Sequence, residues 1–315
     1  MVDARRLRIA FFGTPDFAVP TLRALLATMH PIVAAVSQPD RARGRGQQTK
    51  PTPVKTVAAD AGIPVLQPER LTDPPFGDTL AALRPDLGVV AAYGKILPEW
   101  LIAIPPLGLI NVHASLLPKY RGAAPIQRAV MAGETETGVT IMRIVKELDA
   151  GPTFARVVRP IPEDATSADV GRDLAQAGAS LLVAVVEALA AGTALEEPQD
   201  ERLATFAPKI TREESLVRWE RPAREIHDQV RGLAPWPHAW TRVEGSRVLV
   251  IRTAVEDEGG GAAAGEVLEA SGDVLRVAAG RGCLRLTQLQ PEGRRVMSAR
   301  EFLAGRPLTP GARLS

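Results

Sequence analysis

Gly108 to Gln127 has the sequence Gly-Leu-Ile-Asn-Val-His-Ala-Ser-Leu-Leu-Pro-Lys-Tyr-Arg-Gly-Ala-Ala-Pro-Ile-Gln. It opens as a short apolar strand in which Asn111 and His113 occupy alternate positions, and side chains two apart in a strand lie on the same face. The strand then runs into a loop rich in proline and glycine. Ligands of open α/β sheets bind beyond the carboxyl ends of the strands. We therefore expect an amide and an imidazole side by side where a ligand would bind.

Apolar segments alternate with helical patterns on both sides of this stretch. Helices are expected near 20–28 and 124–132, and a capping-box-like start at Thr166 opens another helix that stops at Gly192. Continuous apolar strands that alternate with helices are typical of a mostly parallel sheet covered on both faces, so the sequence predicts a Rossmann-like α/β domain. The expected strands are 7–12, 32–37, 64–66, 87–92, 109–113 and 138–145.

The last third of the chain has a different character. An amphipathic helix is expected to begin at Pro222, and Ser298-x-x-Glu301 is expected to cap a final short helix. Between them, short strands separated by glycine-rich turns predict a small OB-like β-barrel. We expect a catalytic domain over 1–194, a linker over 195–208 and the barrel over 209–315. The strands are expected near 239–243, 248–251, 265–269, 274–278 and 283–289.

Composition limits the kinds of protein that the chain can be. Its 315 residues are enough for two domains, and the formal charge of +2 is too small to make the whole surface bind polyanions, so any nucleic-acid affinity must come from local clusters. Cys283 is the only cysteine, which excludes an internal disulfide and a cysteine-rich zinc site. We expect no metal.

Nothing in the sequence predicts export or membrane insertion. The start of the chain is short and charged, without a signal peptide, and the longest apolar run, Leu181 to Ala190, is interrupted by Glu187 and too short to span a bilayer. We expect a cytoplasmic, monomeric protein without a membrane partner.

Asn111 and His113 are the first candidates for chemistry. A single histidine on a strand is commonly a structural residue with a satisfied hydrogen bond, but its pairing with Asn111 before a Pro/Gly loop favours function. Together they could donate hydrogen bonds to one developing oxyanion, the interaction usually worth most in acyl transfer. No cysteine lies nearby and Ser115 lacks an obvious Ser-His-Asp arrangement. The pattern therefore favours direct attack by the substrate on a held acyl group.

Three further segments leave alternatives open. Asp149, before Ala-Gly-Pro, is by default a turn residue whose side chain bonds nearby amides, with catalysis as the less favoured alternative. Trp236 and Trp240 could stack on bases, although a core cluster at the foot of the barrel is favoured. The turn at Gly13-Thr14-Pro15 lacks the Gly-x-Gly-x-x-Gly spacing, which argues against an NAD enzyme.

The segment from Arg41 to Lys55 holds five basic residues and no acidic ones, together with several chain breakers. Most such runs are solvated surface loops. A basic loop of this length inside a compact α/β domain is uncommon unless it is functional, so we favour a mobile arm that clamps phosphates and orders on binding.

These residues resemble a known family. Asn111-x-His113-x-Ser115-Leu116-Leu117-Pro118-x-Tyr120-Arg121-Gly122 matches the signature of folate-dependent formyltransferases, and the chain is similar to the methionyl-tRNA formyltransferase family along essentially its whole length. Asp149 falls where the family has its catalytic aspartate. Gln38-Pro39-Asp40-Arg41, Gly44-Arg45-Gly46 and Pro53-Val54-Lys55 resemble the inserted loop that engages the acceptor stem. Pro235-Trp236-Pro237 and the segment Leu289 to Met297 resemble its tRNA-binding barrel.

The resemblance implies formyl transfer from 10-formyltetrahydrofolate to the α-amino group of methionine on initiator methionyl-tRNA. It implies that Asn111 and His113 stabilise the oxyanion while Asp149 sets the protonation of His113 and relays protons. The folate pocket is expected to be lined by Ser115, Leu116, Leu117 and Pro118, and by the backbone of Ala91, Ala92, Tyr93 and Gly94. The tRNA contacts are expected from Arg41, Arg43, Arg45 and Lys50, with Arg45 inserted at the acceptor end.

Two other functions remain open. The acceptor could be a sugar nucleotide or another small amine, against which the basic segment and the barrel argue. The chain could also be a tRNA-binding module on an inactive formyltransferase fold, against which the intact Asn111, His113 and Asp149 argue.

Overall fold

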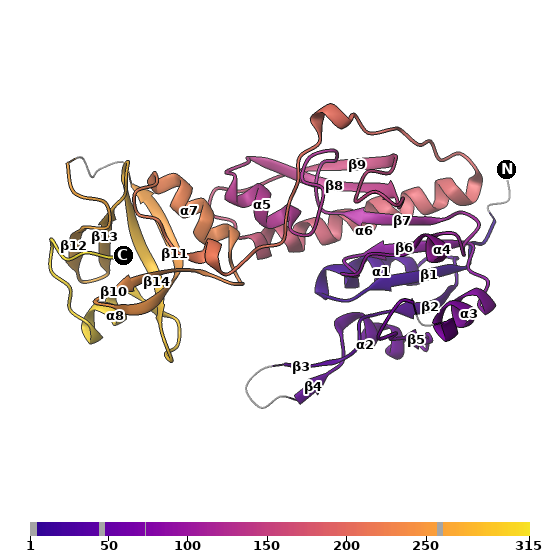
Figure 1. Ribbon diagram of the computed structural model, residues 1–315, viewed down its shortest axis with the longest axis horizontal. Coiled ribbons are helices and arrows are strands. Elements are labelled where there is room, and N and C mark those ends of the chain that lie inside the picture. The colour runs from indigo at the N-terminus through magenta and orange to yellow at the C-terminus, as the bar shows by residue number, and fades with distance from the viewer. Residues whose placement is uncertain (1–4, 44–47, 73, 257–260) are drawn as a thin grey trace. The chain divides into compact units, whose positions relative to one another are not determined.

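The computed structural model describes residues 5–43, 48–72, 74–256 and 261–315. The chain divides into two compact units, which are described separately below (Figure 1). The first unit comprises Met1–Pro125, Thr137–Arg159 and Gly171–Ala207, and the second comprises Ile126–Glu136, Pro160–Val170 and Pro208–Ser315. The boundaries expected at residues 194 and 209 stay a prediction.

The first unit is built on one sheet and flanking helices, in the order that the alternating sequence pattern predicts. Its strands are β1 (Ile9–Gly13), β2 (Ile32–Val36), β5 (Val65–Leu66), β6 (Leu87–Ala91), β7 (Leu109–His113), β8 (Glu136–Arg143) and β9 (Thr153–Pro160). Its helical elements are η1 (Asp16–Ala18), α1 (Val19–Leu26), α2 (Pro53–Asp60), α3 (Pro74–Ala82), α4 (Glu99–Ile102), most of α6 (Ser167–Ala191) and η2 (Glu201–Leu203). Helix α5 (Pro125–Met131), apart from its first residue, and the first residues of α6 belong to the second unit.

The strand order is β5-β2-β1-β6-β7-β8-β9. The pairs from β5 to β7 are parallel, as predicted, so the carboxyl ends of these strands meet at one edge of the sheet. β8 pairs antiparallel with β7, and β9 was not expected from the sequence. The fold class is confirmed as a mostly parallel, Rossmann-like sheet.

The central strands form the core of this unit. Every residue of β1 and β6 is buried, which explains why both segments are continuously apolar. One helix-covered face gathers Phe12, Val36, Leu80 and Leu109 into a single cluster. Burial of this kind stabilises a fold by about 25 cal/mol per Å² of apolar surface, so the central strands give the site its rigid support.

Helix α6 is longer than the apolar run singled out in the sequence. Its 25 residues make it, by length and composition alone, the one helix in the described part of the chain that could cross a membrane. Core helices of soluble proteins pass the same test. Gly178 lies so close to the sheet that an added Cβ would stand 2.9 Å from Val112 and 3.1 Å from Val139, so here the helix packs on β7 and β8.

The basic segment differs from the loop that was expected. β3 (Arg41–Arg43) and β4 (Gln48–Lys50) form an antiparallel hairpin, and α2 begins at Pro53. The sequence does not predict these strands, because their arginine and glutamine residues give no apolar alternation. Thr52 caps α2, since its hydroxyl accepts a hydrogen bond from the Lys55 N–H.

The second unit contains an antiparallel sheet of order β10-β11-β14-β13-β12, with β15 on β14. The residues near Leu314 pair with Val243 of β10 and with Glu266 before β12, which joins the two edge strands into a closed circuit. The elements are η3 (Glu213–Ser215), α7 (Ala223–Gly232), β10 (Ala239–Val243), β11 (Ser246–Glu256), β12 (Val267–Ser271), β13 (Val274–Ala278), β14 (Cys283–Pro291), β15 (Met297–Ser298) and α8 (Ala299–Gly305).

Local signals placed several of these elements correctly. Ser298 and Glu301 form the predicted reciprocal capping box at the start of α8. α7 follows Pro222, as expected, and contacts β11 and β14.

Candidate active site

Strand β7 ends at the edge of the sheet where the parallel strands end. Asn111 lies between Val90 of β6 and Met142 of β8, and His113 lies opposite Thr140. Asn111 is half-buried and His113 is buried. The alternation of the strand therefore presents the two side chains in the order that the sequence predicts.

His113 is held in a defined protonation pattern. Its Nε2 lies 3.0 Å from the carbonyl oxygen of Tyr120. A carbonyl can only accept, so Nε2 carries a hydrogen and donates it. Nδ1 lies 3.7 Å from Oδ2 of Asp149. It follows that Nδ1 is the ring nitrogen that can gain and lose a proton, and it does so beside a carboxylate.

Asp149 is held by its own backbone conformation and by a backbone N–H that binds its carboxylate. It adopts φ +49°, a left-handed conformation that costs a non-glycine residue on the order of 1 kcal/mol. Its Oδ2 accepts a hydrogen bond of 2.8 Å from the N–H of Gly122. The 3.7 Å separation from His113 exceeds a hydrogen bond, so the ring and the carboxylate are neighbours without a direct hydrogen bond. The structure thus brings His113 and Asp149 together.

Ser115 to Pro118 form a tightly tied loop. The buried Ser115 hydroxyl donates to the Lys119 carbonyl at 2.6 Å, and the Ser115 carbonyl accepts from the Thr140 hydroxyl at 2.7 Å. The same hydroxyl oxygen of Thr140 accepts from the Leu117 N–H. Leu117 is buried and Leu116 and Pro118 are half-buried. Ser115 therefore shapes the loop through its hydrogen bonds.

The turn after β6 exposes backbone and buries its aromatic side chain. Ala92 and Gly94 are exposed and have φ +46° and +83°, while the Tyr93 carbonyl between them accepts hydrogen bonds from Thr14 and Gln38. Burial raises the pKa of the Tyr93 phenol to about 12. Its ring packs edge-on against Phe12, and Ala91 is buried in the sheet. The turn thus offers peptide groups at the site.

The basic hairpin follows the carboxyl end of β2, on the same edge of the sheet as His113. Arg41 and Lys50 lie directly opposite one another and are exposed. Asp40 anchors the base of the hairpin through Lys55 and Gln67, and the Lys55 hydrogen bond lowers the pKa of the Asp40 carboxyl. Arg43 lies on β3, and Arg45 lies outside the described residues.

Within the described ranges, no group of three or more histidine, cysteine, aspartate or glutamate side chains is placed to hold a metal ion.

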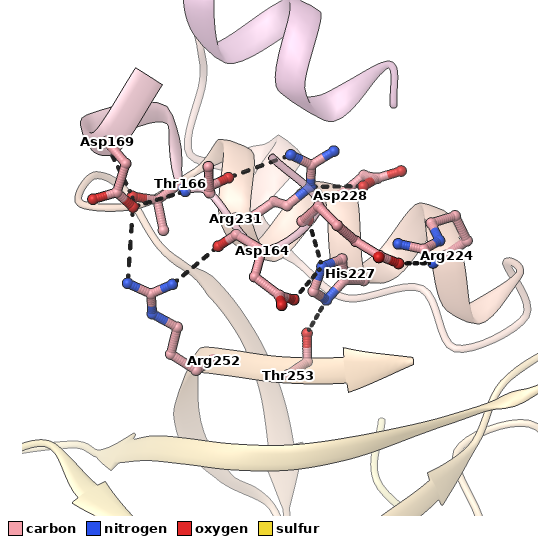
Figure 2. A network of polar contacts seen from close by, with 11 residues as sticks. Asp164, Thr166, Asp169, Arg224, His227, Asp228, Arg231, Arg252 and Thr253 are labelled. Carbon is pink, nitrogen blue, oxygen red and sulfur yellow. Dashed lines mark hydrogen bonds and ion pairs between the residues drawn. The ribbon is translucent and has the colours of Figure 1, made fainter. Parts of the chain in front are cut away.

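A second buried histidine lies in the other unit and was not singled out in the sequence. His227 on α7 contacts Thr253 through Nδ1 at 2.9 Å and the Glu163 carbonyl through Nε2 at 3.4 Å (Figure 2). Burial is the main cause that lowers its pKa below the usual 6.5. Arg252 of β11 and Asp164 line a cavity of about 550 Å³ beside it.

Trp236 and Trp240 do not form the core cluster that was favoured. Trp236 is 53% exposed, and Trp240 is half-buried. The guanidinium carbons of Arg242 and Arg247 lie 5.6 Å and 4.9 Å from the Trp240 ring centroid, within cation–π range. The expectation of a core cluster is therefore wrong, because Trp236 of the Pro-Trp-Pro segment is exposed.

Comparison with known proteins defines the class. Residues 7–186 match the formyl transferase family, and residues 209–307 match its C-terminal domain family. The N-formyltransferase from Helicobacter canadensis, solved with folinic acid and dTDP-3-aminofucose, has a TM-score of 0.70 at 17% identity and covers 90% of this chain and 99% of its own. HypX from Aquifex aeolicus, solved with tetrahydrofolic acid, has a TM-score of 0.62 at 18% identity and covers 98% and 51%. These structures share the fold.

A closer relative narrows the class. The methionyl-tRNA formyltransferase of Moorella thermoacetica is 47% identical over 97% of this chain and 98% of its own length. The chain belongs to the methionyl-tRNA formyltransferase family, as its sequence motifs predicted.

Proposed function

We propose that the protein transfers a formyl group from 10-formyltetrahydrofolate to the α-amino group of methionine on initiator tRNA. The observation that carries the proposal is the pairing of His113 Nδ1 with the Asp149 carboxylate at the carboxyl end of β7, 3.7 Å apart. The names of the relatives, of which one is 47% identical over nearly the whole chain, support the substrate.

Asn111 and a protonated His113 act as donors to the formyl oxygen. The amine attacks the formyl carbon, and the carbonyl oxygen becomes an oxyanion that both side chains stabilise. Nδ1 is suited to this task because Nε2 is already committed to the Tyr120 carbonyl. Donors aimed at developing charge typically contribute about 3 kcal/mol each in a site that excludes water.

Asp149 handles protons. The tetrahedral intermediate collapses when the bond between the formyl carbon and the folate nitrogen breaks, and that nitrogen must take a proton while the former amine loses one. Asp149 lies beside Nδ1 and is 15% exposed, so it can exchange protons with the ring and with a water between them.

The folate would bind between two backbone segments. The exposed peptide groups of Ala92 and Gly94 offer hydrogen bonds to a heterocyclic ring, and Leu116 and Pro118 offer apolar contact from the opposite loop. We assign the formyl-donor pocket to Ala91–Gly94 and Ser115–Pro118 on this basis.

The RNA would be held by the basic hairpin. Arg41 and Lys50 are exposed at the sheet edge that carries His113, so phosphates bound there would bring an acceptor end to the site. Arg43 and Arg45 belong to the same proposed surface on sequence grounds. We further propose that the protein acts in the cytoplasm, as the tRNA substrate named for its relatives suggests, and that it is a monomer.

The test is a labelled-formyl transfer assay with 10-formyltetrahydrofolate and two acceptors, methionyl initiator tRNA and methionyl elongator tRNA. We expect rapid transfer to the initiator and little to the elongator. A sugar nucleotide with a free amine serves as the third acceptor. Transfer to the sugar alone would replace this proposal with the small-amine alternative, and no consumption of formyl-folate would indicate an inactive fold.

A further inference from the structure

The chain that follows α6 returns along the first unit (Figure 1). Thr153 of β9 exchanges two backbone hydrogen bonds with Glu197, at 2.8 Å and 2.9 Å. Arg121 donates its N–H to the Thr205 carbonyl at 2.9 Å and accepts from the Ala207 N–H at 2.7 Å. The segment 197–207, part of the expected linker, is therefore hydrogen-bonded at both ends to the loops beside His113. We call it the return segment.

Gln199 lies near the start of the return segment and contacts the Asp149 loop directly. Its side-chain amide nitrogen donates to the carbonyl of Asp149 at 2.8 Å and to the carbonyl of Gly151 at 2.7 Å. An amide has two N–H donors, and both are used here. They hold two carbonyls of one turn, so the backbone around the left-handed Asp149 is fixed by a single side chain.

Arg121 fixes Gln199 in turn. The Gln199 side-chain oxygen accepts from Nε and Nη2 of Arg121 at 3.1 Å and 2.8 Å. Glu201 accepts from Nη1 and Nη2 at 2.8 Å and 2.7 Å, which is the two-pronged geometry of a strong pair. The Arg121 side chain is only 4% exposed, and its hydrogen bond lowers the pKa of Glu201.

Arg121 also connects this chain to the carboxylate. The residue after it, Gly122, donates its N–H to Oδ2 of Asp149. Asp149 is therefore held twice from the same arginine-centred cluster, through its carboxylate by Gly122 and through its carbonyl by Gln199. A non-glycine residue with φ +49° needs such support if its side chain is to keep one orientation.

We propose that Gln199 is a positioning residue for Asp149, held in place by Arg121 and Glu201. Gln199 touches no reacting atom; it acts by keeping the Asp149 carboxylate at the distance from His113 Nδ1 that proton exchange requires. The proposal rests on the proposed function, because it assigns a role within the same site.

The test replaces Gln199 with Met, which keeps the length and volume of the side chain and removes both donors. The matched control is Glu197→Ala, because Glu197 lies in the same return segment, its side chain is exposed and its backbone bonds remain. We expect Gln199→Met to lower kcat for formyl transfer on the order of tenfold to a hundredfold, as small displacements of a catalytic group do, with KM for both substrates unchanged. The control should match wild type.

Two further measurements separate positioning from simple packing. Gln199→Glu keeps the acceptor for Arg121 but sets carboxylate oxygens against two carbonyls, so it should lose at least as much kcat as Gln199→Met. In an Asp149→Asn background, Gln199→Met should cost less than about twofold, because residues that act as a unit are not additive. The single-turnover rate with labelled formyl donor is measured for wild type, Gln199→Met, Gln199→Glu, Asp149→Asn and the double variant that combines Asp149→Asn with Gln199→Met.

Some results would overturn the role proposed for Gln199 and leave the proposed formyl transfer unaffected. A Gln199→Met enzyme with a lowered Tm and wild-type kcat would show a purely structural role, and an equal loss in the Asp149→Asn background would place its effect elsewhere. Should Gln199→Met fail to fold, wild-type kcat in Gln199→Glu would overturn the proposal equally. Absence of formyl transfer in wild type would instead refute the proposed function.

Discussion

Two of the buried histidines, His113 of the first unit and His227 of the second, use their ring nitrogens differently. His113 and His227 are 5% and 4% exposed, and each has a carboxylate near the ring, Asp149 at 3.7 Å and Asp164 at 3.6 Å. His113 commits Nε2 to a carbonyl and turns Nδ1 toward Asp149. His227 engages Nδ1 with the Thr253 hydroxyl and Nε2 with the Glu163 carbonyl.

The difference is the one expected between the proposed catalytic imidazole, His113, and a structural one, His227. The side chain of Asp149 is 15% exposed and held by a backbone N–H, whereas that of Asp164 is 80% exposed and therefore screened by water. Burial alone does not make a histidine catalytic. A free nitrogen aimed at a fixed carboxylate, at the end of a parallel strand, is what distinguishes His113.

The largest expected effect is on turnover. We predict that His113→Ala and Asn111→Ala each lower kcat on the order of a hundredfold or more, because each removes one donor to the oxyanion while substrate binding changes little. Steady-state formylation of methionyl initiator tRNA measures the loss.

The control for this prediction is His227→Gln, which removes a buried histidine of the second unit and should keep kcat within about twofold, since it lies outside the proposed chemistry. Wild-type turnover in His113→Ala would remove this residue from the site and erase the contrast between the two histidines.

The next effect concerns stability around His227. Asp228 and Arg231 form an ion pair with side chains 5% and 7% exposed, on the helix that carries this histidine. Asp228→Ala leaves a buried guanidinium without its carboxylate, and we predict that it lowers the free energy of unfolding by about 3 kcal/mol. Urea denaturation followed by tryptophan fluorescence gives the value.

An exposed ion pair near the start of the same helix provides the comparison. Arg221 and Glu225 are 43% and 50% exposed, so Glu225→Ala should cost less than about 0.5 kcal/mol. Equal losses in the two variants would mean that the buried pair is as solvated as the exposed one.

The position of His113 on its strand could be predicted from the sequence because the signal is local; its catalytic role stays a prediction. Strand β7 has the expected limits, and alternation alone places Asn111 and His113 in order. The sequence did not predict Gln199 as a site residue, because its contact with Asp149 joins residues 50 apart in the chain and no sequence periodicity indicates such a contact. The partners of His227, Thr253 and Glu163, are likewise remote, at 26 and 64 residues along the chain.

Parts of the fold were missed for related reasons. Strand β9 begins at Thr153, alternates half-buried and exposed residues and carries two arginines, so it lacks the continuous apolar run that identified its neighbours. The antiparallel direction of β8 lies in its pairing with Ile110 to His113 of β7, which a hydropathy pattern does not specify.

The third effect is a pH dependence of stability that belongs to His227. Its folded-state pKa lies below 6.5, so the unfolded chain binds the proton more readily and stability falls as pH drops below 6.5. The slope cannot exceed about 1.4 kcal/mol per pH unit for one group. The charged groups near the ring are Glu163, Asp164, Arg224, Asp228 and Arg231.

We predict that His227→Gln removes this contribution. Between pH 7.5 and 5.5 the variant should lose about 1 kcal/mol less than wild type, measured by urea denaturation at each pH. His238, whose pKa burial also lowers, is present in both proteins and cancels in the comparison. Parallel pH profiles for the two proteins would show that His227 does not stay neutral in the fold.

The smallest effect is expected at the basic hairpin, on the edge of the sheet that carries His113. Arg41→Ala and Lys50→Ala should each weaken tRNA binding by about fivefold at moderate salt and lower the slope of log Kd against log salt by about one, because each cation releases one counterion from RNA. Folate binding should stay unchanged. Arg84→Ala is the matched control, since exposed Arg84 precedes β6 and so lies at the opposite edge. An equal salt slope in all three variants would mean that the hairpin does not touch phosphates and that the cationic contacts must come from another surface.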